Sequence, residues 1–159
     1  MNRLIRLVAF NLDDQKFALF LSAVIRIISV VEITSLPKAP EIVLGVINMH
    51  GRIIPVFDIR KRFRLHQKEM QLSDQLMIAQ TTKRTVALLV DSVSGVVEVP
   101  EEEIVAGGEI LPDLEYVEGV MKKEGGMIFI HDMERFLSLH EEKVLGEAME
   151  ELKQNDRKD

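Results

Sequence analysis

The sequence predicts a mainly β protein built from two similar small barrels, followed by a C-terminal α-helix. Three observations lead to this prediction: an internal repeat, short strand patterns that are apolar on both faces, and a change to helical spacing after Ser138. The chain has 159 residues, of which 47% are hydrophobic. A chain of this length buries about 68–70% of its unfolded surface, which is enough for one or two compact cores.

An internal repeat is the most informative feature of the chain. A hairpin pattern that runs from Gly45 to Asp58 returns from Gly119 to Asp132, at a constant offset of 74 residues. Each copy predicts a strand, a glycine turn, a second strand and an aspartate that caps a short helix. The matched residues are Gly45, Val46, Gly51, Ile54 and Asp58 in the first copy and Gly119, Val120, Gly125, Ile128 and Asp132 in the second. We therefore expect the later glycine of each copy to lie in a turn and each aspartate to be an N-cap.

A further hairpin is predicted before each of these units. Asp13-Asp14 supplies the turn of the first and Thr82-Lys83 the turn of the second. The strands of these hairpins are expected at 4–12 and 15–21, and again at 76–81 and 84–90. Residues that match at an offset of 69 are Leu7, Ala18, Leu19 and Val24 with Leu76, Ala87, Leu88 and Val93. Several matches in the same order indicate a duplicated unit.

The two halves are expected at about 4–63 and 74–137, joined by a polar linker or crossover loop at 65–73. Strands that are apolar on both faces, such as 53–57, favour small closed barrels over one open sheet. Closure also removes exposed sheet edges. Pro55 has no amide donor, so we expect it at a bulge or at the rim of a barrel.

The C-terminal segment 139–159 has a different pattern. Apolar residues recur at spacings of three and four among many glutamates, which predicts an amphipathic helix with a frayed tail from Gln154. Gly146 weakens such a helix by about 1 kcal/mol relative to alanine. The apolar stripe either docks on a barrel or lies in the groove of a partner.

Composition excludes several classes of protein. Without cysteine the chain has no disulfide or thiolate metal site, which suits a reducing cytosol. Arginines interrupt the apolar residues of the first ten positions, so no signal peptide is expected, and no apolar run approaches the roughly 18 residues of a membrane span. A net charge of −6 and only 5% aromatic residues disfavour nucleic-acid binding.

No pattern indicates a reaction centre, a metal site or a cofactor site. The four histidines show no ligand spacing, and we expect His131 to have a packing role. Asp58 and Asp132 are explained as caps and not as a catalytic carboxylate pair. The basic run at 60–64 is expected to be the solvated side and C-terminal end of a short helix, not a phosphate patch. The sequence therefore favours a non-enzymatic binding protein.

Three motifs carry a resemblance to a known family. The pattern Gly-Val-x-Asn-x-x-Gly-x-Ile-x-Pro-Val-x-Asp-x-Arg at 45–60 resembles the signature of the CheW-like domain of bacterial chemotaxis. Residues 87–93 and 116–120 are similar to two further motifs of that family. The resemblance implies a CheW-like domain over 1–138, made of two five-stranded SH3-like barrels with a hydrophobic core between them. Exchange of strands between the halves stays open.

The resemblance also implies a function. Members of this family are cytoplasmic scaffolds of a two-component signalling system. They couple the cytoplasmic tip of methyl-accepting chemoreceptors to the regulatory domain of the histidine kinase CheA, without entering the membrane. This chain is accordingly expected to be recruited to receptor arrays.

Six residues form the partner-binding site that the resemblance implies: Val24, Arg26, Gly45, Val46, Asn48 and His50. Val24 matches a valine near the receptor- and kinase-contacting face, and Gly45 matches a glycine associated with kinase binding. Arg26 and His50 depart from the family, which usually has a Glu and an Arg there that form an opposite-charge pair. We expect these two side chains to be neighbours, with altered partner specificity. We also expect Gly45→Arg to weaken kinase binding with little effect on thermal unfolding.

Three alternatives stay open at this point. The first is a CheW-like adaptor of a chemosensory pathway that governs something other than flagella. The second is a small barrel that binds nucleic acid, and the third is an enzyme or small-molecule carrier with its site between the barrels.

Overall fold

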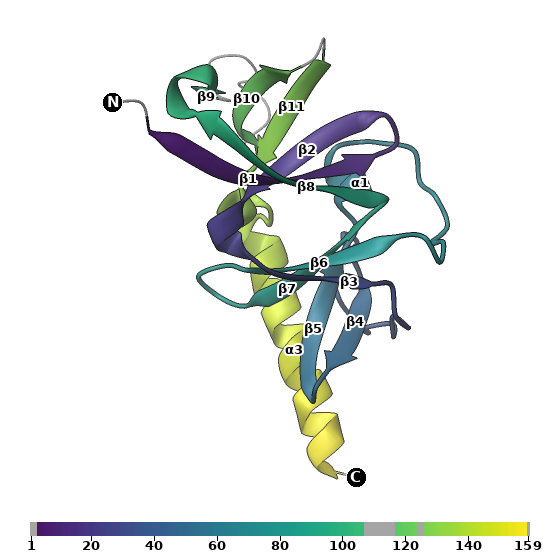
Figure 1. The fold of residues 1–159 in the computed structure, drawn as a ribbon. Coiled ribbons are helices and arrows are strands. Elements are labelled where there is room, and N and C mark those ends of the chain that lie inside the picture. The colour runs from purple at the N-terminus through teal and green to yellow at the C-terminus, as the bar shows by residue number, and fades with distance from the viewer. Residues whose placement is uncertain (1–2, 107–116, 124–125, 159) are drawn as a thin grey trace.

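The structure, a computed structural model, describes residues 3–106, 117–123 and 126–158 and contains two β-sheets and a long C-terminal helix (Figure 1). Sheet A has the strand order β8-β1-β2-β11-β10-β9, and sheet B has the order β3-β6-β7-β5-β4. The strands of sheet A are β1 (Leu4–Leu12), β2 (Gln15–Phe20), β8 (Ser92–Pro100), β9 (Val105–Ala106), β10 (Val117–Lys123) and β11 (Gly126–His131). Those of sheet B are β3 (Val24–Ser29), β4 (Val43–Met49), β5 (Arg52–Phe57), β6 (Gln75–Gln80) and β7 (Thr85–Val90). The helices are η1 (Leu21–Ala23), α1 (Ile59–Arg62), η2 (Glu101–Glu103), η3 (Met133–Arg135) and α3 (Leu139–Lys158).

The chain exchanges hairpins between the two sheets. The β1–β2 hairpin lies in sheet A, where β2 pairs in parallel with β11 from the C-terminal half. The β6–β7 hairpin lies in sheet B, where β7 pairs in parallel with β5 from the N-terminal half. The strand orders β8-β1-β2-β11-β10 and β3-β6-β7-β5-β4 correspond under the sequence repeat. Each sheet therefore contains strands of both repeats.

The prediction of a mainly β fold with a C-terminal helix is confirmed, but the sheets are not closed barrels. In the part of the chain that the structure describes, β3 and β4 remain the edges of sheet B, and β8 and β9 those of sheet A. The segment that follows β3 reaches β4 through an isolated bridge, in which Thr34 and Val46 exchange hydrogen bonds of 2.8 and 2.7 Å. The chain between β3 and β4 therefore covers this side of sheet B, where a closed barrel would have a continuous ladder of hydrogen bonds between the two strands.

Pro55 lies within β5, opposite Val46 and close to a register shift between Val43 and Gly45. Val46 directs its N–H and C=O toward Thr34. The N–H and C=O groups of one strand residue point to the same edge of the strand, so those of Val46 point away from β5. The residue opposite Val46 therefore need not donate a hydrogen bond to β4. A proline is therefore accepted at this position.

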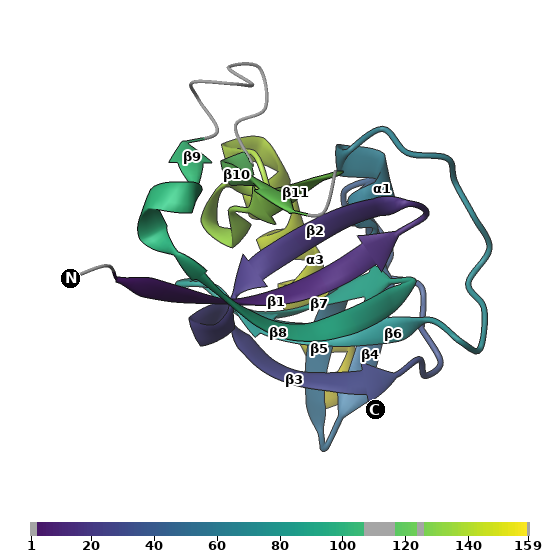
Figure 2. The ribbon, with the colours of Figure 1, turned by 45° about the horizontal axis from the view of Figure 1, so that its top comes forward.

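Apolar side chains form three clusters, one between the sheets and one on the outer face of each sheet. The cluster between the sheets combines residues such as Phe10 and Phe17 of β1 and β2 with Met77 and Leu88 of β6 and β7. Figure 2 shows the ribbons of these four strands. The outer clusters contain equivalent residues: Leu7, Ala18, Ile128 and Ile130 on sheet A, and Leu76, Ala87, Ile54 and Val56 on sheet B. Both sheets are thus buried on two faces, which is why their strands are apolar on both sides.

Helix α3 packs on the cluster between the sheets through Leu145, Ala148, Met149 and Leu152. Its start is a capping box, since Ser138 Oγ accepts from Glu141 N (3.1 Å) while Glu141 Oε1 accepts from Ser138 N (2.9 Å). The helix continues to Lys158, beyond the position at which the sequence predicted a frayed tail. Among the described helices, none has both the length and the apolar character needed to cross a bilayer.

Candidate partner-binding surface

Exposed aliphatic side chains line the edge strand β3 and the segment after it. Ile25 is 53% exposed, Ile27 39% and Val31 43%. The loop 63–74 lies beside this segment, because Val30 N donates to Asp74 O (3.4 Å), and it adds the exposed side chains Met70 and Leu72. Exposed apolar groups gathered on a sheet edge are typical of a protein interaction surface.

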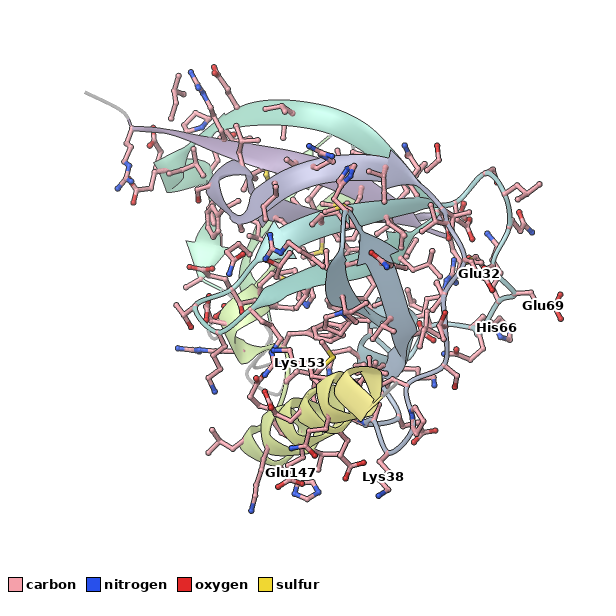
Figure 3. The ribbon with its side chains drawn as sticks, turned by 90° about the horizontal axis from the view of Figure 1, so that it is seen from below. Glu32, Lys38, His66, Glu69, Glu147 and Lys153 are labelled. Atoms are coloured by element: carbon pink, nitrogen blue, oxygen red, sulfur yellow. The ribbon has the colours of Figure 1, made fainter. Side chains whose placement is uncertain are left out.

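Charged and polar side chains border this apolar surface. Glu32 follows β3 and lies on the same side of the molecule as His66 and Glu69 of the loop (Figure 3). Arg26 is exposed between Ile25 and Ile27. Within the described chain, Arg26 makes no hydrogen bond or ion pair, so its charge is available to a partner.

The β4–β5 turn presents polar groups at one end of sheet B. His50 and Gly51 have φ values of +53° and +85°, and Met49 pairs with Arg52, which defines a two-residue hairpin of type I′. Asn48 Oδ1 accepts a hydrogen bond from Gly51 N (2.9 Å), so Asn48 supports the turn. His50 tolerates the left-handed conformation better than most side chains do.

Gly45 and Val46, which are predicted to lie on or beside a partner surface, are both buried in β4, and their contact with a partner stays a prediction. Gly45 has a φ of +155°, and a Cβ atom there would lie 2.2 Å from Thr34 O. Its counterpart Gly119 is equally crowded, with Ile104 Cγ2 at 2.6 Å from such an atom. Both glycines let a neighbouring segment cross a strand closely. The prediction that Gly45→Arg would spare stability is therefore wrong.

The remaining residues predicted for the site are placed as follows. Val24 is half-buried at the start of β3 and packs against the cluster between the sheets. No hydrogen bond or ion pair of the described chain joins Arg26 on β3 to His50 at the β4–β5 turn. That these two are neighbours stays a prediction.

Asp58 and Asp132 have matching geometry at the start of α1 and η3. Asp58 Oδ1 accepts from Arg60 N (3.1 Å) and Asp132 Oδ1 accepts from Glu134 N (3.0 Å), with a φ of −92° at both aspartates. Each side chain satisfies a helix N–H and is explained as a cap. Gly125, the predicted turn of the second copy, lies outside the described residues.

Arg60 was missed by sequence reasoning, which placed the basic run 60–64 in solvent. Its side chain is only 8% exposed and bonds to both carboxylate oxygens of Asp13 (2.9 and 3.0 Å) and of Asp91 (2.7 Å each). Arg62 Nη2 likewise donates to both carboxylate oxygens of Glu141 (2.7 and 2.8 Å). Because these acids lie far away in the sequence, only the fold brings them together.

Arg60 changes the acidity of its partners. Its hydrogen bonds hold the pKa of Asp13 below the ordinary value. Burial alone would raise the pKa of Asp91, but the hydrogen bonds from Arg60 and from Asp13 N outweigh burial, so this pKa is also lowered. Both carboxylates are therefore charged near neutral pH.

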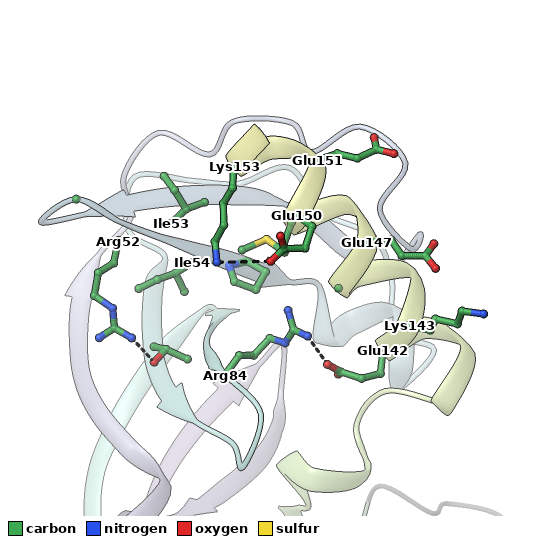
Figure 4. A pocket seen from close by; sticks show the side chains of 15 residues that line it. Arg52, Ile53, Ile54, Arg84, Glu142, Lys143, Glu147, Glu150, Glu151 and Lys153 are labelled. Carbon is green, nitrogen blue, oxygen red and sulfur yellow. Dashed lines mark hydrogen bonds and ion pairs between the residues drawn. The ribbon is translucent and has the colours of Figure 1, made fainter. Parts of the chain in front are cut away.

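A groove of about 1170 Å³ lies between β5 and α3 (Figure 4). Ile53, Pro55 and Met149 give it apolar lining, and its charged lining includes two ion pairs, Arg84 with Glu142 and Lys153 with Glu150. The described part of the chain contains no group of histidines and acids that could hold a metal ion. The described surface features are thus grooves, exposed aliphatic side chains and paired charges, which suit binding.

Comparison with known proteins agrees with this description. The sequence model of the CheW-like domain matches residues 6–141. The chemotaxis protein CheW of Rhizobium meliloti (strain 1021) is 35% identical over 130 residues, which cover 80% of this chain and 84% of that protein. The probable chemotaxis protein CheW of Rhizobium etli is 31% identical over 134 residues, covering 83% and 86%.

A solved structure is similar as well. The scaffolding protein TtCheW from Thermoanaerobacter tengcongensis superposes with a TM-score of 0.79 at 28% identity, covering 89% of this chain and 96% of that one. Most of α3 lies beyond the residues that the family model matches.

Proposed function

The chain belongs to the CheW-like family, and on that premise we propose that it couples methyl-accepting chemoreceptors to the histidine kinase CheA. It acts as a non-enzymatic adaptor in the cytoplasm and is recruited to receptor arrays. The observation that carries the proposal is the exposed aliphatic surface on and after β3, with Ile25, Ile27 and Val31 at its centre.

This surface suits a helical partner. An amphipathic helix buries its apolar stripe in a groove or against an apolar face, and polar residues at the rim set its register. The tip of a receptor supplies such helices, and the β4–β5 turn with Asn48 and His50 supplies a separate polar contact for the kinase domain. Binding both partners at once raises each weak contact through effective concentration.

Arg26 points to a partner that differs from the usual one. It is exposed on β3, and no hydrogen bond or ion pair of the described chain engages it, so its charge complements a carboxylate of a partner. The family usually carries a glutamate here, so the facing partner residue should differ in charge as well. This favours, as the second candidate, an adaptor of a chemosensory pathway with altered partner specificity.

The main test places a charge on the apolar surface. Ile27→Glu should weaken assembly with receptor-containing vesicles and kinase by about tenfold or more, which corresponds to about 1.4 kcal/mol. Leu139→Glu is a matched control, because Leu139 is an 87% exposed aliphatic residue at the start of α3. Equal binding of both variants would refute the role of β3.

A second test concerns charge. The double variant Arg26→Glu with His50→Arg restores the usual family residues. We expect it to bind a standard receptor–kinase pair better and the partners from its own host less well. Unchanged binding to both pairs would remove the specificity argument and leave the adaptor function untouched.

A further inference from the structure

Two pseudo-equivalent contacts connect the sheets. Arg60 lies two residues after the cap Asp58 and binds Asp13 in the β1–β2 turn. Glu134 lies two residues after the cap Asp132 and accepts from Thr82 N (2.8 Å) and Thr82 Oγ1 (2.7 Å) in the β6–β7 turn. Each short helix that follows a strand of one sheet thus holds a hairpin turn of the other sheet.

The two contacts differ in charge and burial. The Arg60 cluster, which consists of Asp13, Arg60 and Asp91, is ionic, and it also takes in His66 O, which accepts from Arg60 Nη1 (3.0 Å). Asp91 lies where the chain crosses from β7 of sheet B to β8 of sheet A, and its Oδ2 accepts from Asp13 N (2.7 Å). The Glu134 contact is exposed and has an uncharged partner.

The Arg60 cluster is directional, whereas the apolar cluster between the sheets is not. Burial of apolar surface favours association of the sheets, but the hydrophobic effect is itself non-directional. The planar guanidinium of Arg60 bonds Asp13 through both terminal nitrogens and Asp91 through Nη2, and such a set of hydrogen bonds is satisfied in one arrangement only. Buried ionic groups add little net stability over apolar groups of similar volume, because desolvation offsets their attraction.

We propose that the Arg60 cluster fixes the orientation of sheet A relative to sheet B, while the apolar cluster holds the two sheets together. The cluster is a positioning device that converts a non-directional interface into a single arrangement. The proposal does not depend on the adaptor function, since it concerns a geometry inside this chain. For an adaptor, the same geometry would set the angle between partners bound to different sheets.

The absence of cysteine makes a direct test straightforward. Cysteines at Lys16 on β2 and Gln80 on β6, both exposed, would carry spin labels that report the distance between the sheets. The triple variant Arg60→Met, Asp13→Asn, Asp91→Asn removes these three charges together. Lys68, whose Nζ lies 3.5 Å from Asp91 Oδ1, retains Asp74 as a partner at 4.0 Å. We expect the distance distribution to broaden, while the thermal midpoint stays within about 5 °C of the parent protein.

Two controls make the result specific. Labels at Ser29 and Gln80 lie within sheet B and should report no change in the triple variant. Glu134→Gln in the chain labelled at Lys16 and Gln80 should leave the distribution narrow, and Arg60→Lys, which keeps the charge but loses the fork, should broaden it.

The outcomes separate orientation from stability. A narrow, unshifted distribution between the sheets in a stable triple variant would overturn the proposal. A large loss of melting temperature or failure to fold would also overturn it, by showing that the cluster supplies stability. Arg60→Lys, labelled in the same way, is an independent test, and a narrow, unshifted distribution in that variant would overturn the proposal as well.

Discussion

Phe57 and His131 occupy equivalent positions in the internal repeat and contact the same aromatic ring. The ring centroid of Phe136 lies 5.2 Å from that of Phe57, in a stacked arrangement, and 4.8 Å from that of His131, edge to face. Both side chains are at most 2% exposed. The second repeat thus places an ionisable ring where the first places a phenyl ring, and this difference gives the fold a pH dependence.

Stability should fall as the pH is lowered from about 6.5 towards 3. Burial, with a smaller contribution from the charge of Arg62, lowers the pKa of His131 from 6.5 to about 3. Between these values only the unfolded chain takes up the proton, so protons favour unfolding. The free energy of unfolding should be about 2 kcal/mol lower at pH 5 than at pH 7.

Urea unfolding at pH 7 and pH 5 measures this effect. His131→Phe, which copies the first repeat, should lose most of the difference between the two pH values. His140→Gln changes an exposed histidine and should retain the difference in stability between the two pH values. An unaltered pH dependence in His131→Phe would assign the effect to other groups.

Gly45 should be far less replaceable than Gly51. Gly45→Ala would push a Cβ atom to 2.2 Å from Thr34 O and break the crossing of residues 33–34 over β4. We expect a loss of about 3 kcal/mol. Gly51→Ala meets open space and only the left-handed φ of +85°, so a loss of about 1 kcal/mol is expected. Denaturant titration of the two variants compares their free energies of unfolding. Similar losses of stability in both variants would contradict the steric explanation.

The repeat was sufficient to predict most of the local structure. The equivalence of Asp58 and Asp132 follows from residues that are adjacent in sequence to the helices they cap, so a local pattern records it. The mainly β fold and the C-terminal helix follow in the same way from strand and helix periodicity.

Contacts between residues that lie far apart in the chain could not be predicted from the sequence. Nothing near Arg60 indicates that Asp13 and Asp91 lie beside it, because that contact depends on which hairpin joins which sheet. For the same reason Gly45 was predicted at a surface: the segment that covers it, at Thr34, comes from another part of the chain. A glycine is required both where the backbone adopts a positive φ and where another segment passes close to it. The sequence alone does not distinguish these two reasons, whereas the structure does.

Gly146 offers a simple route to a more stable protein. It lies inside α3 between the buried residues Leu145 and Ala148, and an added Cβ atom would meet Arg84 Nη2 at an ordinary 3.7 Å. Gly146→Ala should raise the free energy of unfolding by about 0.5–1 kcal/mol, because alanine loses less backbone entropy in a helix. Thermal and urea unfolding measure the gain. A decrease would show that the groove beside Arg84 does not accept the methyl group.

A single change in the Arg60 cluster should be more harmful than neutralising the whole cluster. Asp91→Asn leaves the buried Arg60 with one carboxylate partner, and we expect a loss of about 2–3 kcal/mol at pH 7. The lowered pKa of Asp91 means that its ionised form stabilises the fold above the ordinary value of 3.8 and that this stability is lost as the pH falls through the folded-state pKa. The difference in the free energy of unfolding between the parent protein and Asp91→Asn should therefore be constant from pH 7 to about pH 5. It should become smaller below about pH 4. Unfolding titrations across this range measure this difference in free energy. Asp14 is exposed, so the control variant Asp14→Asn should show no such difference from the parent protein. A difference that stays constant down to pH 3 would mean that Asp91 acts through its shape and not its charge. The His131 effect is common to the parent protein and the variant, so it cancels from this difference.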